Sequence, residues 1–589
     1  MMPCSPSKSP LSVSLAVGHD GPKLSSVRRF CTGRQAANMT SFADTVAQVL
    51  ETVPSTWRGP GGSVAVLKDG ELVGQQVWGY SDLDTRTPLS ADTLLPICSI
   101  TKQMLCALLP SLERNPTPAM QARSGSGSTD AKTQFQDQLS EILGADFVKQ
   151  TGLKVHHLAN NASGIRDYWA LTVLWGAKLD QKFSIDEHIP QVIERVSRSV
   201  HFTPGMGYSY SNVNFVILQR VIEAVSGQTF DELLAQRVFG PSSMKSAFVG
   251  ADSSLHPTRC QGYEGNATEV GYFPAINRIE WAGDAGIVAS LNDMIAYEKS
   301  LDRQWTAKQG WFWDNAQPAT YDDGTPAHYA NGLQSVDVLG VRTVRHGGAL
   351  RGYRLHRCYA PEQRLSVIVM FNHEADAAAA ATSVLQKILG LKQPETLVVQ
   401  AGQEWFGSYF DEEAQMFLTV AEGKKPGEIK ISYVRAPETV KLTDATHAQS
   451  PTLNVSLEGD GNVIVMKRTE DNRTVRATKL SSGGNMNVAK TEIYAPFLGS
   501  YYCEEIDSKL TIQGHSGMLY GVFEGFLGTG AVHLIRHVGE DIWALECARS
   551  MDAPAPGDWT LAFKRDEAGN VAGITVGCWL ARKIEYKKV

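Results

Sequence analysis

The stretch Pro96-Ile-Cys-Ser-Ile-Thr-Lys-Gln-Met-Leu105 decides how the rest of the chain is interpreted. Ser99 and Lys102 lie three residues apart in it, and on a helix this spacing places two side chains on one face. A serine hydroxyl is a weak nucleophile until a neighbour accepts its proton, and a lysine amine can do so when burial lowers its pKa. The same spacing occurs twice more in the chain, so the interpretation depends on partners elsewhere.

Composition narrows the classes of function. The 589 residues suffice for three or four domains, with 43% hydrophobic and 20% charged residues. A net charge of −7 gives no reason to expect nucleic acid or an anionic membrane as partner, and no apolar run approaches the roughly 18 residues that span a bilayer. Nine scattered cysteines without C-x-x-C pairs indicate neither a disulfide framework nor a zinc site. We therefore expect reduced thiols, a cytoplasmic protein, and neither metal nor cofactor.

Two stretches have the composition of segments outside a folded core. Residues 1–39 carry five Lys or Arg, one acidic residue and many serines. This composition resembles an organellar transit peptide and leaves a mitochondrial location open as the alternative. Residues 115–134 are rich in Ser, Gly, Pro and Ala, which predicts a flexible surface insertion. Just before them, Pro110 is expected to shorten or kink the helix that follows Ser99.

A second polar motif lies in Phe202–Phe215, where Tyr210 and Asn212 are two residues apart. On an extended backbone this spacing points both side chains the same way. A phenol can relay a proton between nucleophile and leaving group, and an amide can orient the lysine and a substrate carbonyl. The motif is more specific than the two residues alone, because Pro204-Gly205 precede it and an apolar helical pattern follows it.

A third motif, His346-Gly347-Gly348, completes an order along the chain that resembles the penicillin-recognising serine hydrolases, which include β-lactamases and penicillin-binding proteins. The resemblance implies an α/β (α+β) fold over residues 40–395. In this β-lactamase-like catalytic domain a central antiparallel sheet, flanked by helices, lies beside a helical lobe. Residues 1–39 would then be an N-terminal extension.

The same resemblance assigns roles to individual residues. It places His346-Gly347-Gly348 on an edge strand facing the serine, where glycine lets a substrate backbone approach. It implies that the backbone amides of Ser99 and Ala349 form an oxyanion hole. The stretch Leu158–Trp169 resembles the family's substrate loop, so Asn161 is expected to contact the substrate.

The C-terminal third repeats itself. Residues 405–420 recur as residues 497–512, 92 positions later, with seven of sixteen residues identical. Alternating apolar and polar residues with Gly, Asn and Asp between them predict antiparallel strands. We therefore expect two small β-barrel domains, at 396–490 and 491–589. Domains of this kind also serve in packing or dimerisation, which leaves a homodimer open.

The last barrel contains an unusual loop at 547–557, between two strand-like segments. Two prolines stiffen it, Asp552 lies near its tip, and it is longer than the two to five residues of ordinary hairpin loops. A hydrolase domain with H-G-G followed by two barrels and this loop resembles the D-stereospecific aminopeptidase family. That resemblance implies that the loop enters the active site, where Asp552 meets the amino terminus of the substrate.

These parts predict a serine aminopeptidase that removes N-terminal, preferentially D-, amino acids from small peptides, amides and esters. Ser99 attacks the carbonyl, Lys102 accepts its proton, Tyr210 protonates the leaving group, and water releases the acyl-enzyme. His346 stands where the family often has a lysine that binds a substrate carboxylate, so an anionic substrate is disfavoured. The preference for D-residues comes from the resemblance alone.

Two alternatives share the same motifs. One is a β-lactamase-like esterase or amidase that does not require a free amine, against which the barrels and the Asp552 loop argue. The other is a non-catalytic penicillin-binding-like scaffold. Such scaffolds usually lose one of the catalytic residues, whereas Ser99, Lys102 and Tyr210 are all present.

Overall fold

The computed structural model describes residues 35–124, 130–252, 255, 260–392, 398–434, 437–481, 494–515, 517–547, 549–551, 553–554 and 557–589. The side chains of 35–41 and 553–554 are outside this description. Of the expected N-terminal extension, residues 1–34 lie outside the described residues, and 35–39 belong to the first helix, α1 (Gln35–Glu51).

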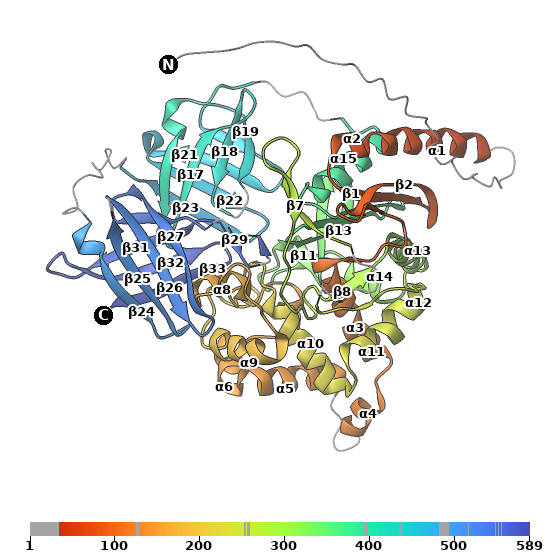
Figure 1. The fold of residues 1–589 in the computed structure, drawn as a ribbon, viewed down its shortest axis with the longest axis horizontal. Helices are drawn as coiled ribbons and strands as arrows, with labels where there is room; N and C mark the ends of the chain where they lie inside the picture. The colour runs from red at the N-terminus through yellow and green to blue at the C-terminus, as the bar shows by residue number, and fades with distance from the viewer. Residues whose placement is uncertain are drawn as a thin grey trace, which may run out of the picture.

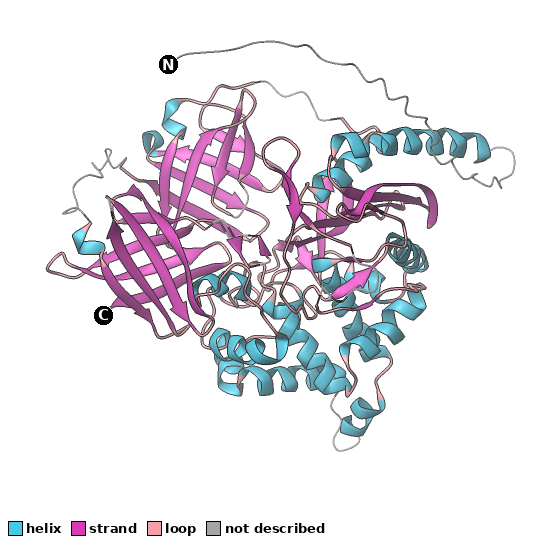
Figure 2. Cartoon of the chain, viewed as in Figure 1, coloured by secondary structure: helices cyan, strands magenta, loops and turns pink. Residues whose placement is uncertain are grey.

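The fold class predicted from the sequence is confirmed. An antiparallel sheet with helices on its faces lies beside a helical lobe, and two barrels follow on the other side of the molecule (Figures 1 and 2). The sheet has the strand order β11-β12-β13-β14-β15-β1-β2-β3. Its strands are β1 (Gly61–Lys68), β2 (Glu71–Asp82), β3 (Thr87–Pro88), β11 (Tyr329–Ala330), β12 (Leu333–Val338), β13 (Val341–Leu350), β14 (Tyr353–Ala360) and β15 (Leu365–Phe371).

Helices cover both faces of this sheet. Apolar residues of α1 and α15 (Ala377–Leu389) pack with one set of sheet side chains, and α13 (Leu291–Ala307) packs on β1 and β15. The remaining helices are α2 (Val53–Thr56), α3 (Thr101–Arg114), α4 (Pro118–Ser124), α5 (Ala131–Leu143), α6 (Ala145–Thr151), α7 (Val155–Ala159), α8 (Tyr168–Leu174), α9 (Ile185–Val196), α10 (Val213–Ser226), α11 (Phe230–Leu234), α12 (Gly240–Ser242) and α14 (Trp311–Asn315). Short strand pairs lie between them: β4 (Leu95–Pro96) and β5 (Phe248–Val249) with β8 (Ile287–Ala289), β6 (Tyr263–Asn266) with β7 (Gly271–Pro274), and β9 (Ala319–Thr320) with β10 (Pro326–Ala327).

Two expectations about the region after Ser99 differ from the structure. Helix α3 continues through Pro110 to Arg114 instead of ending early. A proline removes the hydrogen bond to the carbonyl four residues before it, and here Asn315 Nδ2 donates to that carbonyl, the one of Cys106, at 3.3 Å. Most of 115–134, predicted to be a flexible insertion, is helical, since α4 and the start of α5 lie on either side of 125–129, which are outside the described residues.

The two predicted barrels are both present as closed antiparallel barrels. The first consists of β16 (Gly407–Asp411), β17 (Met416–Glu422), β18 (Glu428–Ser432), β19 (Glu438–Leu442), β20 (His447–Gln449), β21 (Leu453–Glu458), β22 (Val463–Arg468) and β23 (Arg473–Lys479). The second consists of β24 (Gly499–Cys503), β25 (Ser508–His515), β26 (Met518–Gly525), β27 (Gly528–Gly539), β28 (Ile542–Leu545), β31 (Trp559–Arg565), β32 (Val571–Cys578) and β33 (Ala581–Lys588).

The sequence repeat is reproduced in the strand register. Gly407 pairs with Val420 in the first barrel, and the equivalent Gly499 pairs with Ile512 in the second. Tyr409 and Tyr501 are both fully buried, and each hydroxyl donates to the carbonyl four residues earlier, at 3.0 and 2.8 Å. The repeat therefore encodes the barrel closure rather than a binding site.

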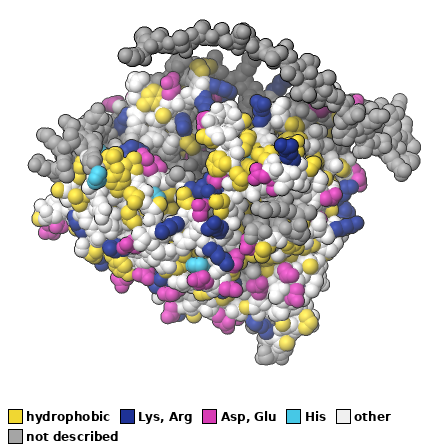
Figure 3. All heavy atoms as spheres, viewed as in Figure 1, with side chains coloured by type: hydrophobic (Ala, Val, Ile, Leu, Met, Phe, Trp, Pro, Cys, Tyr) yellow, Lys and Arg dark blue, Asp and Glu magenta, His cyan; other side chains and the backbone are white. Residues whose placement is uncertain are grey.

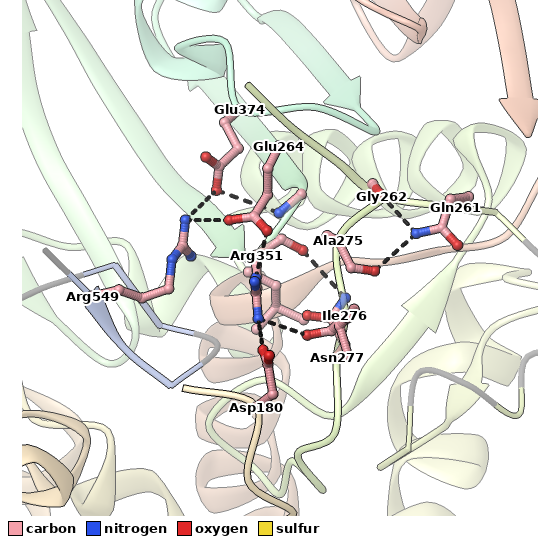
Figure 4. Close-up of polar contacts among 12 residues, drawn as sticks. Asp180, Gln261, Gly262, Glu264, Ala275, Ile276, Asn277, Arg351, Glu374 and Arg549 are labelled. Carbon is pink, nitrogen blue, oxygen red and sulfur yellow. Dashed lines mark hydrogen bonds and ion pairs between the residues drawn. The ribbon is translucent and has the colours of Figure 1, made fainter. Parts of the chain in front are cut away.

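Between β28 and β31 the second barrel sends out a hairpin, β29 (Arg549–Ser550) and β30 (Ala553–Pro554), towards the catalytic domain. Figure 4 shows how Arg549 is held: Nη2 lies 2.6 Å from Glu264 Oε1 and 3.7 Å from Glu374 Oε1. Glu264, only 7% exposed, also binds Arg351 Nε at 2.6 Å. These ion pairs fix the hairpin so that β30 approaches β13 to within 8 Å between Cα atoms.

Three further observations concern the helices, the surface and the cysteines. Among the described residues, no helix is both long and apolar enough to cross a membrane. On the face shown in Figure 3, acidic and basic side chains are interspersed. The seven cysteines in the described part of the chain are free and buried.

We predict that Arg549→Gln lowers the free energy of unfolding by about 1–3 kcal/mol, because it removes a charged partner from the largely buried Glu264 carboxylate. The matched control is Arg536→Gln on the same barrel, whose ion pair with Glu546 is nearly half exposed. An exposed pair contributes below about 1 kcal/mol. Urea unfolding of the full chain measures both, and equal effects would contradict the anchoring role of Arg549.

Candidate active site

Ser99 lies in a single 3₁₀ turn, η1 (Cys98–Ile100), which runs directly into α3. The turn begins with strain, because Cys98 has a φ of +53°, a left-handed value that residues other than glycine rarely adopt. This conformation leads the chain from β4 into the helix and places Ser99 at the wall of a cavity. As predicted from the spacing, the Lys102 side chain meets the serine: Nζ and Ser99 Oγ are 3.0 Å apart.

Lys102 is fully buried, and two further acceptors orient its amine. Nζ donates to Asn212 Oδ1 at 2.9 Å and to the carbonyl of Asp284 at 2.7 Å. When the amine is neutral, these two acceptors take its two N–H groups and leave the lone pair facing the serine hydroxyl. The predicted contact between Asn212 and the lysine is therefore present.

Two buried carboxylates that we did not select from the sequence support this amine. Asp167 Oδ1 accepts hydrogen bonds from both the backbone N and Nδ2 of Asn212, at 2.7 and 3.0 Å, which turns the amide oxygen towards Lys102. Burial raises the pKa of Asp167 to about 6. Burial also raises the pKa of Asp284, whose carboxylate accepts from the Tyr168 hydroxyl at 2.8 Å. The one sign of Asp167 in the sequence is that it lies in the same stretch as Asn161.

Tyr210 lines the same cavity, with the Lys102 amine 5.0 Å from the centre of its ring. Asn161 binds the backbone on both sides of Tyr210. Its carbonyl accepts from the Ser209 backbone at 3.0 Å, and its side-chain oxygen accepts from the Ser211 backbone at 3.1 Å. Asn161 is fully buried and does not line the cavity, so the predicted substrate contact is corrected to a role in holding the segment that carries Tyr210.

His346 is held in one tautomer by two contacts. Its Nδ1 donates to the Gly347 carbonyl at 2.6 Å, and its Nε2 accepts from the Tyr329 hydroxyl at 3.0 Å. Burial, and then the nearby Lys102, lower the pKa of His346 to about 3. The ring is therefore neutral at physiological pH. Tyr329 was not identified from the sequence, since nothing in its local pattern indicates a partner 17 residues away.

Only the second half of strand β13, which carries the H-G-G segment, lies at an edge of the sheet. Strand β12 pairs with β13 no further than Arg345, and residues 346–350 extend past it with β14 on one side. The serine turn occupies the other side, since a Cβ on Gly348 would come within 2.4 Å of the Ile97 carbonyl oxygen. Gly348 is thus required for this close approach. Gly347, Gly348 and Ala349 all line the cavity with Ser99.

The cavity that these residues share has a volume of about 430 Å³. Besides Tyr210, the Trp and Tyr residues in its wall are Trp169, Tyr208, Trp281 and Trp579. Asp552, the residue predicted to bind the substrate amine, lies outside the described residues. The hairpin that flanks it reaches β13, as described above.

One cluster with metal-ligand chemistry lies outside this cavity, contrary to our expectation that the chain contains none. His156, His157 and Asp322 each place a ligand atom within 4.8 Å of the others. His157 Nδ1 accepts from the Lys154 backbone at 3.2 Å, which puts the ring proton on Nε2, 3.3 Å from Asp322 Oδ2. That proton occupies the position a metal would need, so the cluster fits a close contact between a histidine ring and a carboxylate.

We predict that Asp167→Asn changes the pH dependence of stability. The folded pKa of about 6 lies above the ordinary value of 3.8, so Asp167 favours the folded state at low pH and this contribution is lost as the pH rises through 6. Between pH 4 and 7, the unfolding free energy of the variant should therefore gain about 2–3 kcal/mol relative to the wild type. Urea unfolding across this range measures the difference, and a constant difference would contradict the shifted pKa.

Comparisons with known proteins cover almost the whole chain. Residues 42–389 match a β-lactamase family model, and residues 398–587 match a model described as D-aminopeptidase, domain B. The D-aminopeptidase of Brucella anthropi is 40% identical over 537 residues, 91% of this chain and 97% of that protein. The D-aminopeptidase of Brucella ovis is 39% identical over 545 residues, 92% of this chain and 99% of that protein.

A solved D-amino acid amidase from Ochrobactrum anthropi SV3 aligns with 59% of this chain and 99% of its own, at 17% identity and a TM-score of 0.45. The full-length relatives and the two family models carry the assignment. Ser99 and Lys102 lie in the region that matches the first model, and the barrels form the region that matches the second. This chain belongs to the D-aminopeptidase family of β-lactamase-like serine hydrolases.

Proposed function

We propose that this chain is a serine D-aminopeptidase that hydrolyses the bond after an N-terminal D-amino acid in small peptides, amides and esters. The observation that carries the proposal is the contact of 3.0 Å between Ser99 Oγ and the buried Lys102 amine at the wall of the cavity. The relatives that extend over nearly the whole chain are D-aminopeptidases, which supports the substrate class.

The proposed mechanism uses groups that line or adjoin the cavity. Lys102 accepts the Ser99 proton as Oγ attacks the substrate carbonyl, and the amides of Ser99 and Ala349 stabilise the oxyanion. Tyr210 passes a proton to the leaving amine, and water then hydrolyses the acyl-enzyme. Asn212 and Asp167 act indirectly, by orienting the lysine.

The charge of the site supports an amine substrate over a carboxylate substrate. His346 stands where the wider superfamily often has a cationic lysine, and burial keeps this histidine neutral. The wall at this point therefore lacks the positive charge that attracts a carboxylate. Asp552 remains our candidate for the group that binds the substrate ammonium, because it lies near the tip of the loop whose flanking hairpin approaches β13.

The cellular setting and the assembly are also proposals. We place the protein in the cytoplasm, and this is supported by the seven free, buried thiols of the described residues. The mitochondrial alternative rests on the composition of residues 1–39, of which 1–34 lie outside the described residues. A homodimer remains a prediction, which the molar mass in solution tests.

The purified chain should hydrolyse D-alaninamide faster than L-alaninamide, and Ser99→Ala should abolish turnover while the fold is retained. Lys102→Ala should lose about 10²–10⁴-fold in kcat/KM, because it removes the proton acceptor. Mass spectrometry after reaction with a slowly released acylating substrate should locate the adduct on Ser99. An adduct on Cys98 or Cys106 instead would refute the assignment.

Asp552→Asn should separate substrates by their amino group. For amides with a free amine we expect kcat/KM to fall about ten- to a hundredfold, the range for a hydrogen bond to a charged group. Activity on N-acetylated esters should be retained or increase, because a negative charge leaves the cavity while the serine machinery is intact. Parallel losses on both substrate classes would show that Asp552 only stabilises its loop.

A further inference from the structure

The cavity extends from the serine to a turn of the first barrel. Residues 469–472, between β22 and β23, dock on the catalytic domain through several hydrogen bonds. The Glu470 carbonyl accepts from the Tyr321 hydroxyl at 3.0 Å, and Asn472 Nδ2 donates to the Met206 carbonyl at 3.0 Å. Because the turn is fixed in this way, the Glu470 side chain forms part of the cavity wall.

The position of Glu470 along the cavity follows from the segment that carries Tyr210. Tyr208, Tyr210 and Asn212 line the cavity, whereas the intervening serines are buried and do not. Asn212 lies beside Lys102, so Tyr208 lies on the far side of Tyr210 from the lysine. Since Tyr210 protonates the leaving group in the proposed mechanism, Tyr208 borders the leaving-group end of the cavity.

Glu470 and the ring of His328 belong to this part of the wall. Among the described residues, no hydrogen bond or ion pair engages the Glu470 carboxylate, whereas the Arg354 guanidinium, also on the wall, is bound to Glu374 at 3.0 Å. One nitrogen of His328 bonds to the Glu470 carbonyl, and its Nδ1 is buried without a partner in the described part of the chain. Burial lowers the pKa of His328 to about 4. The ring is therefore neutral at physiological pH and adds no positive charge to the wall.

Aromatic rings and the local charges complete the environment. The Tyr208 ring lies 4.7 Å from the His328 ring and 6.0 Å from the Trp579 ring, measured between centroids. The faces of such rings attract cations. Burial, and then Glu438, raise the pKa of Glu470, while Arg468 and Arg345 lower it. The net shift is upward, and a cation bound beside Glu470 would favour its ionised form.

We propose that Glu470 and the rings of Tyr208 and Trp579 form a subsite for a positively charged group on the leaving part of the substrate. A lysine side chain at the second residue of a peptide has this chemistry: its ammonium carries donors for the Glu470 carboxylate and a charge that aromatic rings attract. This inference rests on the proposed aminopeptidase activity. It gives the first barrel a role in specificity, because that barrel supplies Glu470.

The test compares kcat/KM for three substrates: D-Ala-Lys-amide, D-Ala-norleucine-amide, whose side chain is uncharged and of similar length, and D-alaninamide, which does not reach the subsite. We expect the wild type to favour lysine over norleucine about ten- to a hundredfold. Glu470→Gln should bring that ratio close to one. Its loss on the lysine substrate should exceed any loss on D-alaninamide at least about tenfold.

Two further variants guard against misfolding as the explanation. Glu470→Lys should reverse the preference, so that D-Ala-Glu-amide becomes better than D-Ala-Lys-amide. Glu458→Gln, which removes an exposed carboxylate paired with Arg476 on the same barrel, is the matched control and should leave the lysine-to-norleucine ratio at the wild-type value.

The outcomes separate this inference from the function on which it rests. Hydrolysis of all three substrates by the wild type without a preference for lysine would overturn the subsite alone. Equal losses on all three substrates in Glu470→Gln would overturn it as well, since they indicate a structural role. Failure of the wild type to hydrolyse any of the three would overturn both proposals.

Discussion

The buried amine of Lys102 is the constraint on which the catalytic domain depends. An amine without exposed surface is costly unless its hydrogen-bonding groups have partners. Those partners come from three places far apart in the chain: Ser99 in the turn before α3, Asn212 at the start of α10, and Asp284 in the turn before β8. Asp167 then fixes the amide of Asn212. The segments that carry Ser99, Asn212 and Asp284 must therefore meet at one point for the lysine to be satisfied, and Ser99 and Asn212 line the cavity there.

The two barrels share a scaffold and differ in what protrudes from it. The same strand register and the same buried tyrosine close each barrel, at Tyr409 and Tyr501. The first barrel adds the turn 469–472 to the cavity wall, and the second adds the Arg549 hairpin near β13 and the ring of Trp579. Loops on a rigid scaffold are a frequent place for binding groups. Duplication of a stable barrel thus provided two separate supports for walls of one cavity.

Charge is distributed so that the cavity offers acceptors rather than cations. His346 is neutral because it is buried beside a lysine, and Arg354 is engaged by Glu374. Glu470, an acceptor, belongs to the wall at the leaving-group end. A substrate with positive charge gains hydrogen bonds in such a site, whereas a carboxylate would meet acceptors. The same electrostatic logic thus links the aminopeptidase proposal to the cationic subsite.

The sequence by itself determined the features that depend on local spacing. The S-x-x-K and Y-x-N motifs, the H-G-G segment, the two barrels and the order of the domains follow from periodicity, motif spacing and a repeat of 92 residues. Only the tertiary structure decided which groups support the lysine, since Asp167 lies 45 residues from Asn212 and Asp284 lies 182 residues from Lys102. It also excluded Asn161 from the cavity and brought Glu470 to its wall. The physical reason is that burial and partnership across the chain depend on how distant elements pack, and no local pattern of residues encodes that packing.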